Sequence, residues 1–198
     1  MTLKRSTCPH RRKHKLVNQP FLPKDFPSLS YTRLLHNRHR VDDVILTKAR
    51  RNKQIIYGSK AMDRQLTPIL REERSDYDVY SKRPRRDAND VQRQLDRVVA
   101  DGHNDFYSKP ALHKDTWKVM HEGKDGEKNT RDDVGIVDYT NMKRKIKTVS
   151  YNGIAYEEIN SIVKRKHQIL ADPQSKYRHE KDKKALNIIG LSKKIEDV

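Results

Sequence analysis

The sequence predicts a small α/β domain built around a mixed β-sheet. Over residues 41–100, short segments rich in β-branched and aromatic residues alternate with segments whose apolar residues recur at helical spacing, an order typical of strands and helices packed in layers. After residue 105, several strand-like segments follow one another with no helix between them. Because a parallel pair needs a long crossover connection, this second part of the sheet is not purely parallel.

Composition divides the chain into three segments. We expect an extended basic arm over 1–40, a folded domain over 41–156 and a basic helical tail over 157–198. The arm contains four of the eight prolines, the basic run 11–15 and no sustained apolar period, which is typical of a segment that orders only against a partner. Its larger apolar residues could dock onto a neighbour or fold back onto the domain: Phe21, Leu22, Phe26 and Leu29.

Helices and strands alternate at the start of the domain. Apolar residues at near-helical spacing predict a helix over 41–51, and the apolar run 54–57 predicts a strand that ends at Gly58. A helical pattern resumes over 60–71. Pro68 lies inside that pattern and predicts a kink or an early end, because proline lacks the amide hydrogen that an inner helical turn requires.

The middle of the domain is dominated by strands. Residues 77–81 are predicted to form a strand from their β-branched and aromatic content. Apolar residues on one face predict a helix over 89–100, with Asn89 as its N-cap. Residues 122–132 are rich in Gly, Lys and Asp and are expected to form a loop. Three further strands are expected at 105–108, 116–121 and 134–139.

A hairpin and two helices complete the expected architecture. Segments 147–151 and 154–156 flank an Asn-Gly pair, which is a strong signal for a tight hairpin turn. The helices are expected over 157–170 and over 174–189, with Pro173 between them. The fold class is therefore α/β (α+β): a small mixed sheet flanked by helices, with an extended basic arm before it and a helical tail after it.

The charge of the chain predicts a polyanionic partner. The 198 residues include 44 Lys and Arg against 27 Asp and Glu, a formal net charge of +17. Cationic side chains that neutralise phosphates release condensed counterions, which favours binding to RNA or another polyanion. The alternative is a solvated cationic surface. With 33% hydrophobic residues, a compact core is expected for about two thirds of the chain.

Cysteine and histidine usage excludes several kinds of site. A single cysteine, Cys8, excludes an internal disulfide framework and fits a reducing compartment. A metal site at Cys8, His10 and His14 lacks a second cysteine pair, and surplus basic charge explains this segment better. We expect His113 and His121 at the surface. No apolar run has the length of a membrane span or of a signal peptide, so a soluble intracellular protein without a membrane partner is expected.

Gly58 and Ser59 are candidates for a phosphate seat. They lie where a predicted strand turns into a predicted helix, so backbone N–H groups at the helix start can face an anion. Glycine lets a phosphate approach the backbone closely, and Ser59 adds a hydroxyl donor. Lys60 and Arg64, one helical turn apart, could reach the same phosphate or remain solvated helix charges. The alternative for Gly-Ser is an ordinary turn.

Asp76 and Asp78 are candidates for binding divalent cations. In a strand, residues i and i+2 point to the same face, so the two carboxylates converge. Oxygen ligands suit Mg²⁺ or Mn²⁺. Two like charges on one face repel unless a cation or basic neighbours stabilise them. The alternative is an exposed strand edge with a solvated acidic face.

Asp138 is the third candidate carboxylate. It lies in the apolar segment 134–139, where an acid is costly unless it is paired or bound to a metal ion. If this strand lies beside the strand of Asp76 and Asp78, the three form one cluster. Asp138 is then the natural general base, or a ligand of a second ion, for an incoming hydroxyl. The alternative is an ion pair with a nearby lysine.

A family resemblance joins these motifs. The run Ile-Ile-Tyr-Gly-Ser-Lys-Ala-Met-Asp-Arg-Gln-Leu, followed by Ser-Asp-Tyr-Asp-Val-Tyr-Ser and a late Asp-Tyr-Thr, resembles the polymerase β-type nucleotidyltransferase superfamily. It is most similar to nucleotidyltransferase-like proteins of large DNA viruses related to the catalytic subunit of poxvirus poly(A) polymerase. The resemblance covers residues 54–140; the tail, with Tyr177-Arg178 and Lys181-Asp182, matches less specifically, and the arm is not covered.

The resemblance implies a metal-dependent enzyme that transfers a nucleoside monophosphate from a nucleoside triphosphate to a hydroxyl acceptor, with RNA among the candidate acceptors. By the same resemblance, Gly58 and Ser59 bind the triphosphate, and Asp76, Asp78 and Asp138 bind Mg²⁺ or Mn²⁺. It also places the protein in the host cytoplasm or inside a virion. Two alternatives remain. One is a minor virion protein that reuses the fold and whose basic arm binds neighbouring virion proteins or nucleic acid. The other is a nucleic-acid-binding module with an inactive site.

Overall fold

The computed structural model describes residues 27–71, 76–143 and 145–196. Within these residues, seven strands form one mixed sheet in the order β3-β4-β5-β2-β1-β7-β6. The pairs β1/β7 and β2/β5 are parallel, and the other neighbouring pairs are antiparallel. The strands are β1 Ile55–Tyr57, β2 Tyr77–Ser81, β3 Phe106–Pro110, β4 Thr116–His121, β5 Val134–Asn141, β6 Thr148–Tyr151 and β7 Ile154–Glu157. The expected mixed sheet is confirmed.

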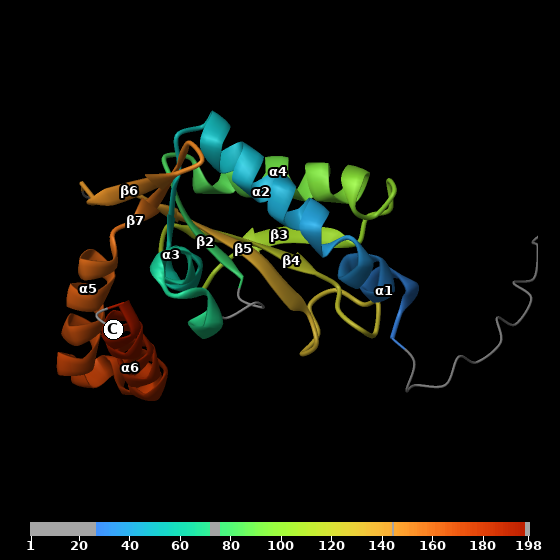
Figure 1. Cartoon of the computed structure of the whole chain (residues 1–198). Helices are drawn as coiled ribbons and strands as arrows, with labels where there is room; N and C mark the ends of the chain where they lie inside the picture. The colour runs from blue at the N-terminus through green and yellow to red at the C-terminus, as the bar shows by residue number, and fades with distance from the viewer. Residues whose placement is uncertain (1–26, 72–75, 144, 197–198) are drawn as a thin grey trace, which may run out of the picture.

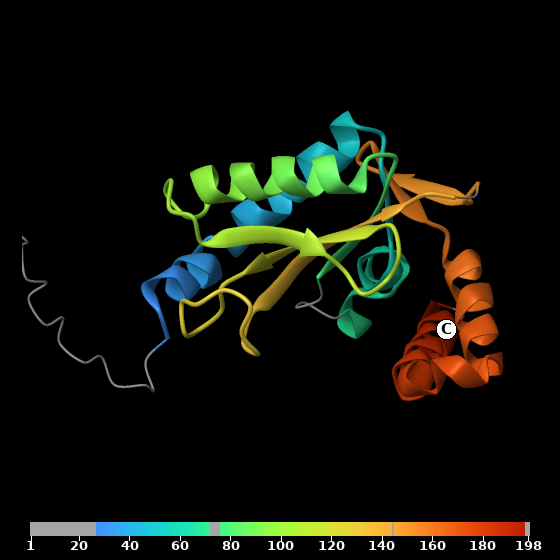
Figure 2. The same ribbon diagram turned by 180° about the vertical axis from the view of Figure 1, so that it is seen from behind.

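Helices cover both faces of this sheet (Figure 1). The helices α2 and α4 lie together on one face, and α3 lies on the other, with α5 and α6 at its side; Figure 2 shows the same layers from behind. The helices are α1 Leu29–His36, α2 Arg38–Arg51, α3 Gly58–Gln65, α4 Pro84–Val98, α5 Ile159–Ala171 and α6 His179–Glu196, with 3₁₀ turns η1 Pro68–Leu70 and η2 Pro173–Arg178. In the described part of the chain, none of these helices combines the length and the apolar character needed to cross a membrane.

The main core lies between the sheet and the α2/α4 pair. Val41 and Ile45 of α2 and Val91 and Leu95 of α4 are fully buried, as is Val79 of β2. Each such side chain contributes about 1.5–3 kcal/mol of transfer free energy when it leaves water. Because β2 buries alternate residues on this face, its intervening residues point to the opposite face of the sheet.

The helical tail is fastened to the sheet through α3. Gln65 Nε2 donates to the carbonyl of Glu157 at 2.8 Å, and its Oε1 accepts from the Ile159 amide at 3.0 Å. The Thr67 amide donates to Ser192 Oγ at 3.0 Å. The end of β7, the start of α5 and the late part of α6 are therefore held at fixed positions beside α3.

Two local signals are confirmed in detail. Pro68 ends the third helix early: α3 stops at Gln65, and a short 3₁₀ turn starts at Pro68. Asn152 and Gly153 join β6 to β7 with φ angles of 50° and 73°. Positive φ at both positions is the requirement of a type I′ turn, which Asn-Gly meets at low cost.

Three sequence expectations differ from the structure. Residues 1–26 of the expected arm lie outside the described residues, but Leu29–His36 is helical, with Ser28 Oγ accepting from the Tyr31 amide as N-cap. The fourth helix starts at Pro84, so Asn89 lies inside it and is not an N-cap; proline at the first position fits the φ angle of a helix start. The last helix starts at His179 and reaches Glu196.

Candidate active site

Asp78 and Asp138 lie side by side on neighbouring parallel strands. Strands β2 and β5 pair with Asp78 opposite Asp138, and paired residues point to the same face of a sheet. Asp76 precedes Asp78 by two residues and faces the same side. All three line one pocket of about 580 Å³, on the face of the sheet opposite to α2 and α4. The expectation that the three acids share one face agrees with this geometry.

Gly58 adjoins the carboxylate of Asp78. Strand β1 pairs with β2 so that Tyr57 lies opposite Asp78, and α3 starts at the next residue. Gly58 has a φ of +70°, and a Cβ at this position would overlap Asp78 Oδ2. Only glycine combines this backbone angle with this close approach. Gly58 and Ser59 both line the pocket at the start of α3, where amide groups lack helical partners.

The pKa of Asp78 is raised by burial and by the two neighbouring carboxylates. Burial, then the charges of Asp76 and Asp138, raise the pKa of Asp78 to about 7, and Arg165 and Lys181 oppose that rise. The free energy of the ionised pocket is therefore high without a bound cation, because like charges in a partly desolvated site repel.

Asp138 also has a lysine neighbour. Lys118 Nζ lies 3.7 Å from Asp138 Oδ2, and the two side chains remain 29% and 21% exposed. Burial raises the pKa of Asp138, while Lys118 lowers it and Asp76 raises it further. The ion pair that was one alternative for Asp138 thus exists as a long contact, together with the carboxylate cluster.

The three carboxylates share the pocket but do not form a closed ligand set. Across residues 27–71, 76–143 and 145–196, no three His, Cys, Asp or Glu side chains are arranged as a metal-binding group. Asp76, Asp78 and Asp138 nevertheless line the same pocket.

Cationic side chains from the helical tail form the opposite wall. Five tail residues with cationic or aromatic groups line the pocket: Arg165, Lys166, Tyr177, Arg178 and Lys181. Two buried carboxylates orient this wall. Glu157, 1% exposed, accepts an ion pair from Arg165 Nη2 at 2.6 Å, and Asp182, fully buried, accepts one from Lys166 Nζ at 2.7 Å. The pocket therefore has one acidic wall and one cationic wall.

Aromatic rings and hydroxyls form the floor between these walls. The rings of Tyr57 and Tyr80 stack with their centroids 3.9 Å apart, and the Arg165 guanidinium lies over Tyr57 at 5.3 Å. Tyr57 Oη is 2.9 Å from Thr140 Oγ1, which is 3.1 Å from Thr116 Oγ1. These contacts make the floor a continuous hydrogen-bonded surface next to Asp78 and Asp138.

Two of the expected phosphate-binding residues lie outside the pocket. Lys60 Nζ lies 5.1 Å from the ring centroid of Tyr77, whose side chain is on the α2/α4 face of β2. The Arg64 guanidinium lies 5.3 Å from the ring of Tyr151 in the β6–β7 hairpin. Neither residue lines the pocket, because successive turns of α3 direct them away from the strand ends.

Sequence reasoning missed the cationic wall and one histidine. Arg165 and Lys166 belong to no sequence motif, and the pairs Tyr177-Arg178 and Lys181-Asp182 match the family pattern only weakly. His113 is exposed, as expected, and also lines the pocket. His121 is buried, only 1% exposed, and its Nδ1 accepts from the Gly123 amide at 3.1 Å; its alternation within β4 was the signal that could have shown this.

This chain is similar to known proteins in its structure and not detectably in its sequence. No family model matches the sequence, and no curated protein matches it significantly. The structure is similar to a Megavirus polyadenylate synthase, with a TM-score of 0.59 and 18% identity over 92% of this chain and 40% of that one. JHP933 from Helicobacter pylori aligns with a TM-score of 0.45 and 14% identity, over 75% of this chain and 60% of that one. The chain thus spans less than half the length of the Megavirus protein, and this likeness shows that the two proteins share a fold.

Proposed function

We propose that this protein is a metal-dependent nucleotidyltransferase that moves a nucleoside monophosphate from a nucleoside triphosphate to a hydroxyl acceptor, with RNA as the candidate acceptor. The observation that carries the proposal is the pairing of Asp78 with Asp138 beside Gly58, opposite a wall of Arg and Lys side chains. A triphosphate with bound cations fits between an acidic and a cationic wall, because each wall then meets charge of the opposite sign.

The acidic wall fits Mg²⁺ or Mn²⁺. Its donors are carboxylate oxygens, which these ions prefer. Burial, and then repulsion from Asp76 and Asp138, raise the pKa of Asp78, and a bound divalent cation would offset that repulsion. Asp76, Asp78 and Asp138 would hold the ion. When bound, such an ion neutralises charge on the triphosphate oxygens and favours attack by a hydroxyl.

The other residues of the pocket have distinct proposed roles. Backbone amides at Gly58 and Ser59, at the start of α3, donate to triphosphate oxygens. Arg165 and Lys181 neutralise the negative charge of the triphosphate. Asp138 either binds a second ion or accepts the proton of the acceptor hydroxyl. In the latter role, the hydroxyl oxygen forms a bond to the α-phosphorus, the bond to the β-phosphate oxygen breaks, pyrophosphate leaves and the proton passes to the carboxylate.

Transfer of labelled nucleotide tests this function. Each nucleoside triphosphate is offered with Mg²⁺ or Mn²⁺ and RNA, using the wild type, Asp78→Asn, Asp138→Asn and the control Asp101→Asn. Asp101 is exposed, lies outside the pocket and already has a positive φ that Asn tolerates. We expect both pocket variants to lose transfer by about 100-fold or more and the control to retain it. Full activity in the pocket variants rejects the assignment.

Two further measurements distinguish the alternatives to this function. A minor virion protein that reuses the fold would be found in stoichiometric amounts in purified particles, with virion proteins as its partners. Residues 1–26 of the arm on which that alternative rests lie outside the described residues. An inactive nucleic-acid-binding module would bind RNA in a salt-sensitive way but would show no thermal stabilisation by a nucleoside triphosphate with Mg²⁺.

A further inference from the structure

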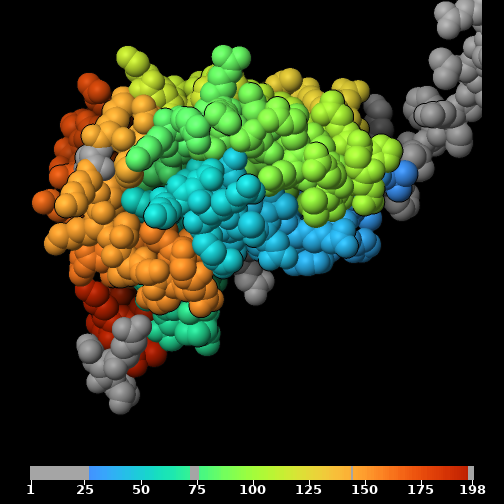
Figure 3. Space-filling model, turned by 90° about the horizontal axis from the view of Figure 1, so that it is seen from above, coloured from blue at the N-terminus to red at the C-terminus, as the bar shows by residue number. Residues whose placement is uncertain are grey.

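A groove lies between α2 and α4. These helices cover the face of the sheet away from the helices α3, α5 and α6 (Figure 1). The two helices run antiparallel. At one end, Arg40 Nη1 donates to the carbonyl of Val98 at 3.2 Å, and nearer the other end Lys48 Nζ lies 3.0 Å from Asp90 Oδ2. In the space-filling view from above, α2 and α4 lie side by side across this face (Figure 3). The central hollow of the groove has a volume of about 340 Å³.

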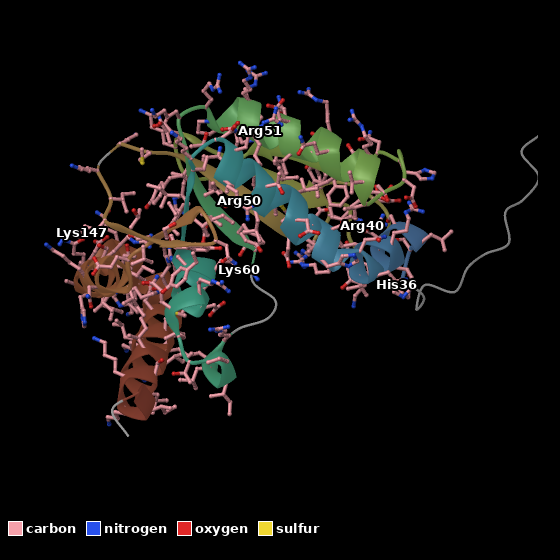
Figure 4. All side chains as sticks on the ribbon, turned by 45° about the horizontal axis from the view of Figure 1, so that its top comes forward. His36, Arg40, Arg50, Arg51, Lys60 and Lys147 are labelled. Carbon is pink, nitrogen blue, oxygen red and sulfur yellow. The ribbon has the colours of Figure 1, made fainter. Side chains whose placement is uncertain are left out.

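Cationic side chains line both walls of this groove. They are Lys48 and Arg51 from α2, Arg83 at the entrance to α4, and Arg86, Arg93 and Arg97 from α4. Only Asp87 and Asp90 supply negative charge to the same hollow. Arg40 and Arg51 mark the two ends of α2 in Figure 4. The groove therefore has a strong positive excess along its length.

The cations of α4 form one line. Positions 86, 93 and 97 are separated by seven and four residues, which places their side chains on one face of a helix. Eleven residues of α-helix extend about 16 Å. Along one strand of a duplex, with a rise of about 3.4 Å per phosphate, this length corresponds to about five phosphates.

The two carboxylates of the groove already have partners. Asp87 is 4% exposed, accepts from Gln54 Nε2 at 2.7 Å and from Ser81 Oγ at 2.5 Å, and lies 3.2 Å from Lys48 Nζ. Asp90 pairs with Lys48 and Arg93. The two carboxylates therefore stabilise the packing of α2, β2 and α4. They neutralise only part of the positive charge of the groove.

As far as the chain is described, three arginines of the groove have no short-range partner, although Lys48 and, to a smaller extent, the charge of Arg86 lower the pKa of the nearby Asp90. Among the residues that the structure describes, the side chains of Arg51, Arg86 and Arg97 make no hydrogen bond, ion pair or ring contact, and all three are exposed. Arginines gathered in a groove repel one another unless an anion neutralises them. A guanidinium presents a planar fork of donors that matches the oxygens of a phosphate.

We propose that the α2/α4 groove binds the phosphodiester backbone of a nucleic acid without reading its sequence. A strand fits better than a flat anionic surface, because the cations stand on two facing walls and continue in a line along the groove. The groove shares no residue with the catalytic pocket. Backbone binding here goes beyond the proposed transfer reaction and does not depend on it.

The test compares two triple variants of the full chain. The groove variant is Arg51→Gln, Arg86→Gln and Arg97→Gln. The control is Arg131→Gln, Lys193→Gln and Lys194→Gln, which removes the same charge from exposed positions outside the groove. Affinities for a labelled single-stranded RNA and a DNA of the same sequence are measured over a series of salt concentrations. We expect the groove variant to bind about tenfold more weakly than wild type at low salt. The negative slope of log affinity against log salt concentration should become shallower by about 2, because three phosphate contacts are removed.

Other outcomes decide against the groove. The proposal is overturned if the groove variant matches wild type in affinity and slope, or if the control loses as much as the groove variant. It is also overturned if the wild type binds phosphatidylserine vesicles in preference to both oligonucleotides and the groove variant loses that binding. Thermal unfolding of each variant confirms that it is folded. The groove variant should keep the thermal stabilisation by a nucleoside triphosphate with Mg²⁺ that the proposed function predicts, so the two proposals fail separately.

Discussion

The Cα of Gly58 faces the carboxylate of Asp78 so closely that a methyl group at position 58 would overlap Asp78 Oδ2. Behind that oxygen, Asp78 Cγ and Cβ would lie 3.1 and 3.4 Å from the added carbon. Rotation of the carboxylate relieves only the first contact. A side chain at position 58 would therefore push Asp78 away from Asp138 and change the acidic wall.

We expect Gly58→Ala to abolish stabilisation by Mg²⁺ and a nucleoside triphosphate. The substitution combines a strained φ of +70° with displacement of Asp78. Gly102→Ala is the matched control, because its φ is +86° and no atom lies within 4 Å of the added carbon. The backbone cost alone is about 1–2 kcal/mol. In thermal shift assays, Gly102→Ala should be less stable but should still be stabilised by Mg²⁺ and a nucleoside triphosphate. The same stabilisation in Gly58→Ala would contradict the proposed triphosphate site at Gly58.

Lys118→Met is expected to strengthen binding of Mg²⁺ by about threefold to tenfold. Lys118 Nζ lies 3.7 Å from Asp138 Oδ2 and competes with a cation for that carboxylate. Both side chains are partly exposed, so solvent screening limits the effect. Calorimetric titration measures it, with the exposed Lys193→Met as the control. An unchanged or weaker affinity would show that Lys118 does not compete for the acidic wall.

Arg165→Ala should lower the free energy of unfolding by about 2–4 kcal/mol, because the Glu157 carboxylate would lose its cation while only 1% exposed. Arg165→Lys retains the charge, and we expect it to lose clearly less stability. Urea denaturation measures both. Since Arg165 also lies over the ring of Tyr57 and lines the pocket, the Ala variant should also bind a nucleoside triphosphate more weakly. Equal stability of the two variants would show that the ion pair does not support the tail.

His121 makes the stability of the fold sensitive to acid. Burial lowers its pKa below the ordinary 6.5, although Asp105 and Asp133 raise it; Arg33 lowers it further. The folded chain therefore keeps a neutral imidazole at a pH where the unfolded chain has bound a proton. Stability is present in full above about pH 6.5 and is lost as the pH falls toward the lower pKa of the folded state.

Denaturation at about pH 7.5 and about pH 5.5 checks this dependence. We expect His121→Gln to be less stable than wild type at the higher pH, since it disturbs the hydrogen bond from the Gly123 amide to Nδ1. It should, however, lose less stability on acidification. His103→Gln, at an exposed position, should follow the wild-type profile. The same acid loss in wild type and in His121→Gln would rule out His121 as the source.

Local patterns predicted much of the fold because their causes are local. β-branched and aromatic content identified β2, and alternation of apolar residues identified β4, both with the residue bounds that the structure has. Pro68 ended α3, and Asn152-Gly153 made the hairpin turn. Asn89 was wrong as an N-cap because the preceding residues are charged and hide a helix start at Pro84. A polar first turn carries no apolar period, although α4 packs its later residues into the core.

For the site, local sequence patterns predict which residues could hold a metal ion and a phosphate: the Asp-x-Asp spacing puts two carboxylates on one face, and Gly58 ends a strand. Whether Asp138 joins them was decided by the parallel pairing of β2 with β5, between residues 60 positions apart in sequence. The cationic wall and the α2/α4 groove likewise arise from contacts between distant segments. Charge and spacing within one segment cannot specify them, because they depend on how helices and strands pack around the core.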